Sequence, residues 1–86
     1  MKYEVNKVIQ FENGEYLILD VINKNNDVYL YLINNDEYKS DVSLVKVNNE
    51  NNDIMYDYIN DEEEFDYVLN QLFVNNEKDI LNFVLD

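Results

Sequence analysis

The apolar pattern centres on two runs rich in β-branched and aromatic residues, at positions 16–22 and 28–33. The polar patch at positions 23–27 separates them. A polar patch of this length between two such runs predicts a hairpin with a loop rather than a two-residue turn. The centre of the predicted fold is therefore an antiparallel sheet.

Alternation within the two runs predicts which side chains face the core. One side of the first run carries Leu17, Leu19 and Val21, and we expect this side to face the core. The second run has a tyrosine side, with Tyr29 and Tyr31. Because a tyrosine ring can cover a sheet while its hydroxyl group stays in water, we expect that side to be half solvated.

Three further strands are predicted around this hairpin, at residues 7–11, 41–48 and 54–59. The first is followed by Asn13 and Gly14, and an Asn-Gly pair favours a type I′ turn because both central residues need positive φ. We therefore expect the first strand to fold directly back onto the second. The polar residues 48–53 predict a loop between the last two strands.

A helix is predicted to begin at Asn60 or Asp61. Asp61 and Glu64 match a capping box, and acidic residues in the first turn favour the positive end of the helix dipole. The apolar residues that follow have helical spacing and form one face: Phe65, Val68, Leu69, Leu72 and Phe73. Residues 77–85 fit either a short second helix or a continuation of the first, and we prefer the helix interpretation.

The order of these elements predicts an α+β domain. A small antiparallel sheet of four to five strands is followed by one or two C-terminal helices packed on one face. Residues 1–86 form a single domain, because a chain of 86 residues has no room for a second core. A chain this short buries a limited share of its surface, so we expect modest stability unless it dimerises.

Composition excludes several kinds of chemistry. The chain has no Cys and no His, so disulfides, thiolate nucleophiles and the commonest general base are absent. Its single glycine argues against phosphate-binding loops, which need several. The polar residues 48–53 resemble a calcium loop in composition. An EF-hand loop needs glycine at its sixth position and glutamate at its twelfth, but counted from Asn48 these positions hold Asp53 and Ile59, so the pattern fails. We expect no cofactor and no specific metal site.

The charge balance constrains the partner. Nineteen acidic residues against six lysines give a formal net charge of -13, which opposes direct binding to nucleic acid or to an anionic membrane. The chain also lacks an apolar run long enough to span a membrane and the apolar core of a secretion signal, so we expect it in the cytoplasm. The expected partner is a basic protein surface.

Most of the acidic residues that could meet such a partner lie between Lys46 and Lys78, where no basic residue occurs. The candidate partner-binding residues combine acids with tyrosines: Asp53, Tyr56, Asp57, Tyr58, Asp61, Glu62, Glu63, Glu64 and Asp66. One interpretation is a solvated face whose acids cap a helix. The other is one continuous negative surface that imitates nucleic-acid phosphates, with these tyrosines and Tyr67 contacting Lys and Arg stems.

An enzyme is the third hypothesis. Paired carboxylates could serve as a general acid and base of the glycosidase type, but that mechanism needs a cleft that shifts their pKa values. The acids of this chain gather in polar segments and at a helix start, where solvent is expected. We therefore expect a protein that acts by binding and not by catalysis.

Two resemblances follow from the motifs. The segments EYLILDVI at residues 15–22, VYLYLINN at 28–35 and DEEEFDYVLNQLF at 61–73 resemble the bacterial domain-of-unknown-function family numbered 1292. That resemblance covers residues 8–73 and implies a cytosolic bacterial protein with no established activity. In size and charge the chain is also similar to small acidic anti-CRISPR proteins, which implies a phage-encoded, nucleic-acid-mimicking inhibitor of a CRISPR effector. The alternative to an inhibitor is a housekeeping interaction domain whose acidity is only solvating.

Overall fold

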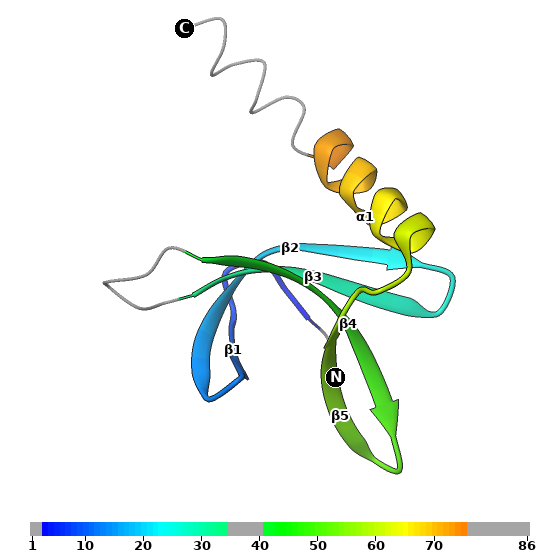
Figure 1. The fold of residues 1–86 in the computed structure, drawn as a ribbon. Coiled ribbons are helices and arrows are strands. Elements are labelled where there is room, and N and C mark those ends of the chain that lie inside the picture. The colour runs from blue at the N-terminus through cyan, green and yellow to red at the C-terminus, as the bar shows by residue number, and fades with distance from the viewer. Residues whose placement is uncertain (1–2, 35–40, 76–86) are drawn as a thin grey trace, which may run out of the picture.

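The computed structural model describes residues 3–34 and 41–75, and these form a five-stranded antiparallel sheet followed by one helix (Figure 1). Strand order in the sheet equals chain order: β1 (Val8–Phe11), β2 (Gly14–Lys24), β3 (Asp27–Asn34), β4 (Val42–Glu50) and β5 (Asp53–Tyr58). Helix α1 spans Glu62–Asn75. The predicted α+β class is confirmed, while the interpretation of residues 77–85 lies outside the described residues.

Residues in the left-handed conformation make the turn between β1 and β2. Phe11 pairs with Gly14, so Glu12 and Asn13 form the turn, with φ of 48° and 61°. Gly14 does not have positive φ. The predicted tight hairpin is confirmed, but its central residues lie one position earlier than the Asn-Gly pair suggests.

The β2–β3 and β4–β5 hairpins have tighter turns than the sequence predicts. Lys24 pairs with Asp27 across two asparagines, and Glu50 pairs with Asp53 across two more. Asparagine tolerates positive φ better than most residues, and Asn25, Asn51 and Asn52 adopt it here. The expected longer loops at residues 23–27 and 48–53 are wrong, because polar residues at the strand ends still pair through their backbones.

A β-bulge in β2 reverses the alternation that the sequence predicts. The register with β3 shifts between Ile18 and Asp20, which leaves Leu19 as the extra residue. As a result Tyr16 and Ile18 before the bulge, and Ile22 after it, are the buried residues of this strand. The side expected to face the core is only partly buried: Leu17, Leu19 and Val21. That expectation is wrong: Tyr16 and Ile18 face the first apolar cluster described below, and the one-residue shift after them moves Ile22 to the opposite face, which α1 covers.

One apolar cluster lies on the face of the sheet that points away from α1. Its buried members come from four strands: Phe11, Tyr16, Ile18, Leu30, Leu32 and Val45. The β1–β2 and β4–β5 hairpins bend toward this side (Figure 1). The ring centroid of Phe11 on β1 therefore lies 5.6 Å from the ring centroid of Tyr58 and 6.3 Å from that of Tyr56, and both contacts are edge-to-face. The two edge strands thus curve around the cluster from either side.

A second cluster joins α1 to the opposite face of the sheet. Ile22 and Tyr29 of the sheet pack against Val68 and Leu72 of the helix. Tyr29 is only 1% exposed, so the expectation that its side of the sheet is half solvated is wrong for this residue, which α1 covers. Of the predicted helix face, three residues remain exposed: Phe65 at 38%, Leu69 at 49% and Phe73 at 61%. The helix therefore packs along only one edge of its apolar face.

Candidate functional site

The candidate acidic residues gather on β5 and on α1. On β5, Asp57 pairs with Lys46, whose ammonium group contacts the helix residue Glu64, so the Asp57 side of the strand is the side that carries α1. Asp53 lies four residues earlier and shares that side. Four more candidate acids belong to the helix or precede it directly: Asp61, Glu62, Glu63 and Asp66. The structure thus brings these acids to one side of the sheet.

Asp61 determines where the helix begins. Its Oδ1 atom accepts a hydrogen bond of 2.9 Å from the backbone N–H of Glu64, which is the N-cap interaction. Glu62 and Glu63 follow in the first turn, where the helix dipole favours negative charge, and both are exposed. The predicted N-cap at Asp61 is confirmed and gives this candidate acid a structural role. The other half of the predicted capping box is not formed, because the Glu64 carboxylate bonds Tyr29 and Lys46 instead.

The Glu64 carboxylate is occupied inside the protein. Its Oε2 atom accepts a hydrogen bond of 2.6 Å from the Tyr29 hydroxyl and one of 3.0 Å from the Lys46 ammonium group. Lys46 also lies 3.8 Å from the carboxylate of Asp27. Glu64 therefore ties α1 to β3 and β4, which leaves it less available to a partner than the exposed acids beside it.

These contacts shift the pKa values of all three groups. The hydrogen bonds from Tyr29 and Lys46 hold the pKa of Glu64 below its ordinary value. Burial, followed by the hydrogen bond to Glu64, raises the pKa of Tyr29, and the hydrogen bond to Glu64 raises the pKa of Lys46. All three shifts favour the protonation states that this arrangement requires at neutral pH.

The candidate tyrosines do not share the surface of the acids. Alternation along β5 places Tyr56 and Tyr58 opposite Asp57, on the side of the first apolar cluster. The Tyr56 hydroxyl lies 3.1 Å from the Tyr3 hydroxyl, while the Tyr58 side chain is half exposed. Burial, and then a hydrogen bond to Tyr56, raises the pKa of Tyr3. The expectation of one continuous surface combining these tyrosines with the acids is wrong, and the two-residue period of the strand is the physical reason.

Tyr67 has a different environment again. The Lys24 ammonium group lies 4.2 Å from the centroid of its ring, a cation–π contact between α1 and the end of β2. The ring is partly buried beside the second apolar cluster. Tyr67 therefore contacts a basic group of its own chain, so this ring already uses the contact that we expected a partner to supply.

A polar hollow of about 320 Å³ lies between the β2–β3 turn and the start of α1. Acidic, basic and amide groups line it: Lys24, Asn25, Asp27, Tyr29, Asp61, Glu63 and Glu64. Two lysines, Lys24 and Lys46, offset part of its negative charge. The sequence does not indicate this hollow, because Asp27 and Lys46 are far along the chain from the acids of the helix.

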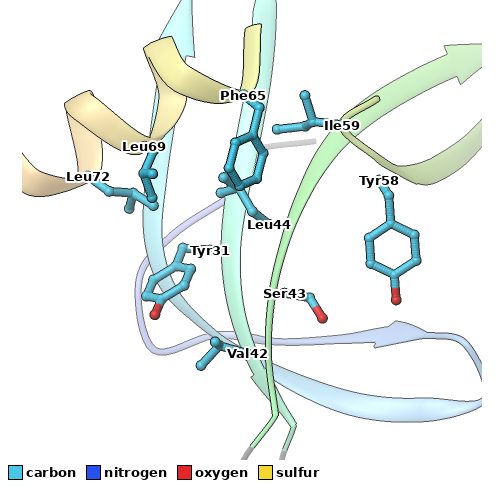
Figure 2. A pocket seen from close by; sticks show the side chains of 9 residues that line it. All are labelled: Tyr31, Val42, Ser43, Leu44, Tyr58, Ile59, Phe65, Leu69 and Leu72. Carbon is cyan, nitrogen blue, oxygen red and sulfur yellow. The ribbon is translucent and has the colours of Figure 1, made fainter. Parts of the chain in front are cut away.

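An apolar groove of about 390 Å³ runs between α1 and the sheet (Figure 2). Its lining residues come from β3, β4, the end of β5, the segment that joins β5 to α1, and α1: Tyr31, Val42, Ser43, Leu44, Tyr58, Ile59, Phe65, Leu69 and Leu72. Figure 2 shows Phe65, Leu69 and Leu72 directed from the helix toward the sheet. The only sequence feature that points to this groove is the apolar face of α1, which is wider than the part that packs against the sheet.

Neither cavity has the features of a glycosidase-type site. Among the described residues, no carboxylate lines the apolar groove, and in the polar hollow Asp27 and Glu64 pair with the ammonium group of Lys46. Within residues 3–34 and 41–75, no group of three or more Asp or Glu side chains is arranged to hold a metal ion. In the same part of the chain, no helix has the length and apolar character to cross a membrane.

Comparison with known proteins finds no family model, no curated protein and no solved structure that matches this chain. The resemblances to the family numbered 1292 and to anti-CRISPR proteins therefore stay predictions. Geometry and charge carry the functional argument.

Proposed function

We propose that this protein is a non-enzymatic acidic binding protein of the cytoplasm whose partner is a basic, nucleic-acid-binding protein. One observation carries the proposal, namely where the lysines lie. In the described part of the chain both salt bridges belong to Lys46, which pairs with Asp27 and Glu64 at the contact between helix and sheet. None of the described lysines forms a salt bridge with the exposed acids of α1: Glu62, Glu63 and Asp66.

These exposed carboxylates, with Asp53 and Asp57 on β5, form the proposed acidic surface. A net charge of -13 attracts a positively charged surface and repels nucleic acid, so a partner's phosphate-binding Lys and Arg residues suit it best. The proposed mechanism is competition, in which the carboxylates occupy the sites that otherwise hold phosphates. The specific form that we favour is a phage-encoded inhibitor of a nuclease such as a CRISPR effector.

A housekeeping interaction domain is the second candidate, and the apolar groove between α1 and the sheet favours it. A partner held mainly by that groove would bind through apolar contacts. Its affinity would depend little on salt, whereas the affinity of a nucleic-acid mimic falls steeply as salt screens its charges. The two functions are therefore separable by one measurement.

The test is affinity capture of binding proteins from a bacterial lysate, with mass spectrometry of what is retained. Captured complexes are washed at about 0.05 M salt and then at about 1 M, where the screening length is about 3 Å. A parallel sample is eluted with duplex DNA. We expect a nucleic-acid-binding protein that is retained at low salt and released by either high salt or DNA. A partner that resists both would overturn the mimic.

Two charge variants locate the contact. Glu62→Lys/Glu63→Lys reverses two exposed acids of α1, and Glu4→Lys/Glu15→Lys makes the same charge change on exposed residues near β1. Glu64 is left intact because its carboxylate bonds Tyr29 and Lys46. We expect the first variant to lose the partner and the second to keep it, with circular dichroism confirming that both fold. Equal capture by the two variants would remove the α1 acids from the mechanism.

A further inference from the structure

We propose that the apolar groove between α1 and β4 is the docking site for a cationic amphipathic helix of the partner protein. This inference rests on the function proposed above. It adds the place where the partner's apolar side chains bind and the form that the partner's basic segment takes.

The groove exposes large apolar side chains on both of its walls. Phe65 and Leu69 form the helix wall, and Leu69 is 49% exposed. Val42 stands on the β4 wall and is 51% exposed, with Leu44 beside it in the groove. An apolar hollow of about 390 Å³ with such walls has room for side chains of another molecule.

The exposed side chains of α1 form a ridge that suits a second helix. Phe65, Leu69 and Phe73 stand at i, i+4 and i+8, so the ridge extends about 12 Å along the helix axis. A helix lying beside α1 can place its own i and i+4 side chains between this ridge and Val42. The sheet forms the floor of the groove, and its strands β3 and β4 are paired with one another there.

Charge identifies the kind of helix. Glu62 and Asp66 precede Phe65 and Leu69 by three residues, so each lies next to its apolar neighbour on the surface of α1. On the other wall, the exposed Asp41 directly precedes β4. Among the described residues, no lysine lines the groove. Lys or Arg side chains that flank the apolar face of a docked helix would therefore meet the carboxylates of Glu62 and Asp66 along the α1 wall.

A second copy of this chain fits the groove less well. Each copy carries a net charge of -13, and symmetric pairing through α1 would bring together two helices that carry acidic residues and no lysine. Like charges at an interface cost free energy and act against a partner of the same sign. The charge that disfavours a second copy is the charge that favours a cationic helix.

The test is a nuclear magnetic resonance titration of the full chain labelled with ¹⁵N. The probe is a short synthetic amphipathic helix of leucine and lysine, and a peptide of the same composition with its leucines spread around the helix is the control. We expect the amphipathic peptide to shift the amide resonances of Val42, Leu44 and Leu69. We expect it to bind at least about tenfold more tightly than the control peptide, because only its apolar face can fill the groove.

Two matched variants link the binding to the groove. Leu69→Ser removes an apolar side chain from the groove wall, and Val74→Ser removes an exposed apolar side chain of α1 that does not line the groove. Because both side chains are exposed, both variants should fold. We expect the first to weaken binding of the amphipathic peptide about tenfold and the second to leave it unchanged.

Each contrary outcome has a distinct meaning. Equal binding of both peptides, with shifts confined to the acids of α1, would overturn the groove and leave the proposed function in place. Equal binding of a leucine and glutamate helix would overturn the cationic partner and count against the proposed function as well. Groove resonances that shift with protein concentration alone would show that a second copy occupies the groove. Groove resonances that respond to no peptide would show that the groove does not bind such a helix. Either result overturns the inference.

Discussion

The hydroxyl group of Tyr29 on β3 donates a hydrogen bond of 2.6 Å to the carboxylate of Glu64 on α1. The two residues are 35 positions apart, and the bond fixes the first turn of the helix against the centre of the sheet. Lys46 of β4 donates to the same carboxylate oxygen at 3.0 Å. Three elements therefore meet at one acidic group, and the contact lies beside the second apolar cluster.

Removing the Tyr29 hydroxyl should lower the stability of the fold. Tyr29→Phe leaves the ring in place and takes away one donor to a charged acceptor. We expect the free energy of unfolding to fall by about 1.5–3 kcal/mol, the usual scale for a hydrogen bond to a charged group. Urea denaturation measures it. Tyr31→Phe, on the same strand and the same face, is the control and should cost less than about 0.5 kcal/mol. Equal losses of unfolding free energy in the two variants would show that the hydrogen bond to Glu64 does not stabilise the fold.

The stability that Glu64 contributes should depend on pH. Its pKa in the folded protein lies below the ordinary value of 4.5, because Tyr29 and Lys46 hydrogen-bond the charged form. The contribution is therefore present above pH 4.5 and is lost as pH falls through the lowered pKa. The difference in unfolding free energy between the natural protein and Glu64→Gln should be constant near neutral pH and shrink below pH 4.5.

Urea denaturation at a series of pH values from neutral to acidic tests this behaviour. Glu63→Gln is the matched control, because Glu63 is exposed in the same turn of α1. A difference between the natural protein and Glu64→Gln that stays constant down to acidic pH would contradict the role of ionisation. The loss would then reflect packing of the Glu64 side chain alone.

The single glycine should be dispensable, although the sequence indicates the opposite. Gly14 lacks positive φ, and a Cβ atom there would meet Tyr16 Cε2 at 3.5 Å and the Phe11 carbonyl oxygen at 3.6 Å, which are ordinary contacts. We expect Gly14→Ala to be neutral or stabilising by less than about 1 kcal/mol. Asn13→Ala should cost about 1 kcal/mol, because Asn13 has a φ of 61°. Thermal unfolding compares the two, and a larger loss at Gly14 would disprove the turn assignment.

Two neighbouring residues of α1 should differ sharply in how much they contribute to the stability of the fold. Val68 is fully buried against the sheet, and Leu69 is half exposed in the groove. We expect Val68→Ala to lower the free energy of unfolding by about 2 kcal/mol, through lost burial and the cavity that remains. Leu69→Ala should cost less than about 1 kcal/mol. Urea denaturation distinguishes them, and comparable losses would show that the groove is filled in solution.

Much of the fold follows from the sequence because it depends on local signals. The two long strands, the helix start at Asp61 and the order of sheet and helix all appear in the residue pattern. Alternation and helical spacing act over a few positions, so they are legible without the fold. The position of the β1–β2 turn was missed by one residue, since Glu12 takes a positive φ that its residue type seldom adopts.

The candidate site also combines features that the sequence predicts with features that depend on contacts between distant residues. The exposed acids Glu62, Glu63 and Asp66 lie where the charge pattern places them. Sequence reasoning does not separate Glu64 from these neighbours, because its partners Tyr29 and Lys46 are 35 and 18 positions away. The apolar groove was also missed, since it exists only where α1 leaves part of β4 uncovered.

Composition and local periodicity are therefore sufficient to predict the α+β class, the approximate strand and helix positions and the strongly negative charge of this protein. They leave open which side of each strand is buried. The bulge at Leu19 moves Ile22 to the face opposite Tyr16 and Ile18, and the placement of α1 buries Tyr29 while it leaves Leu69 exposed. These outcomes depend on contacts between residues far apart in the chain, which form only when the sheet has curved and the helix has packed against it.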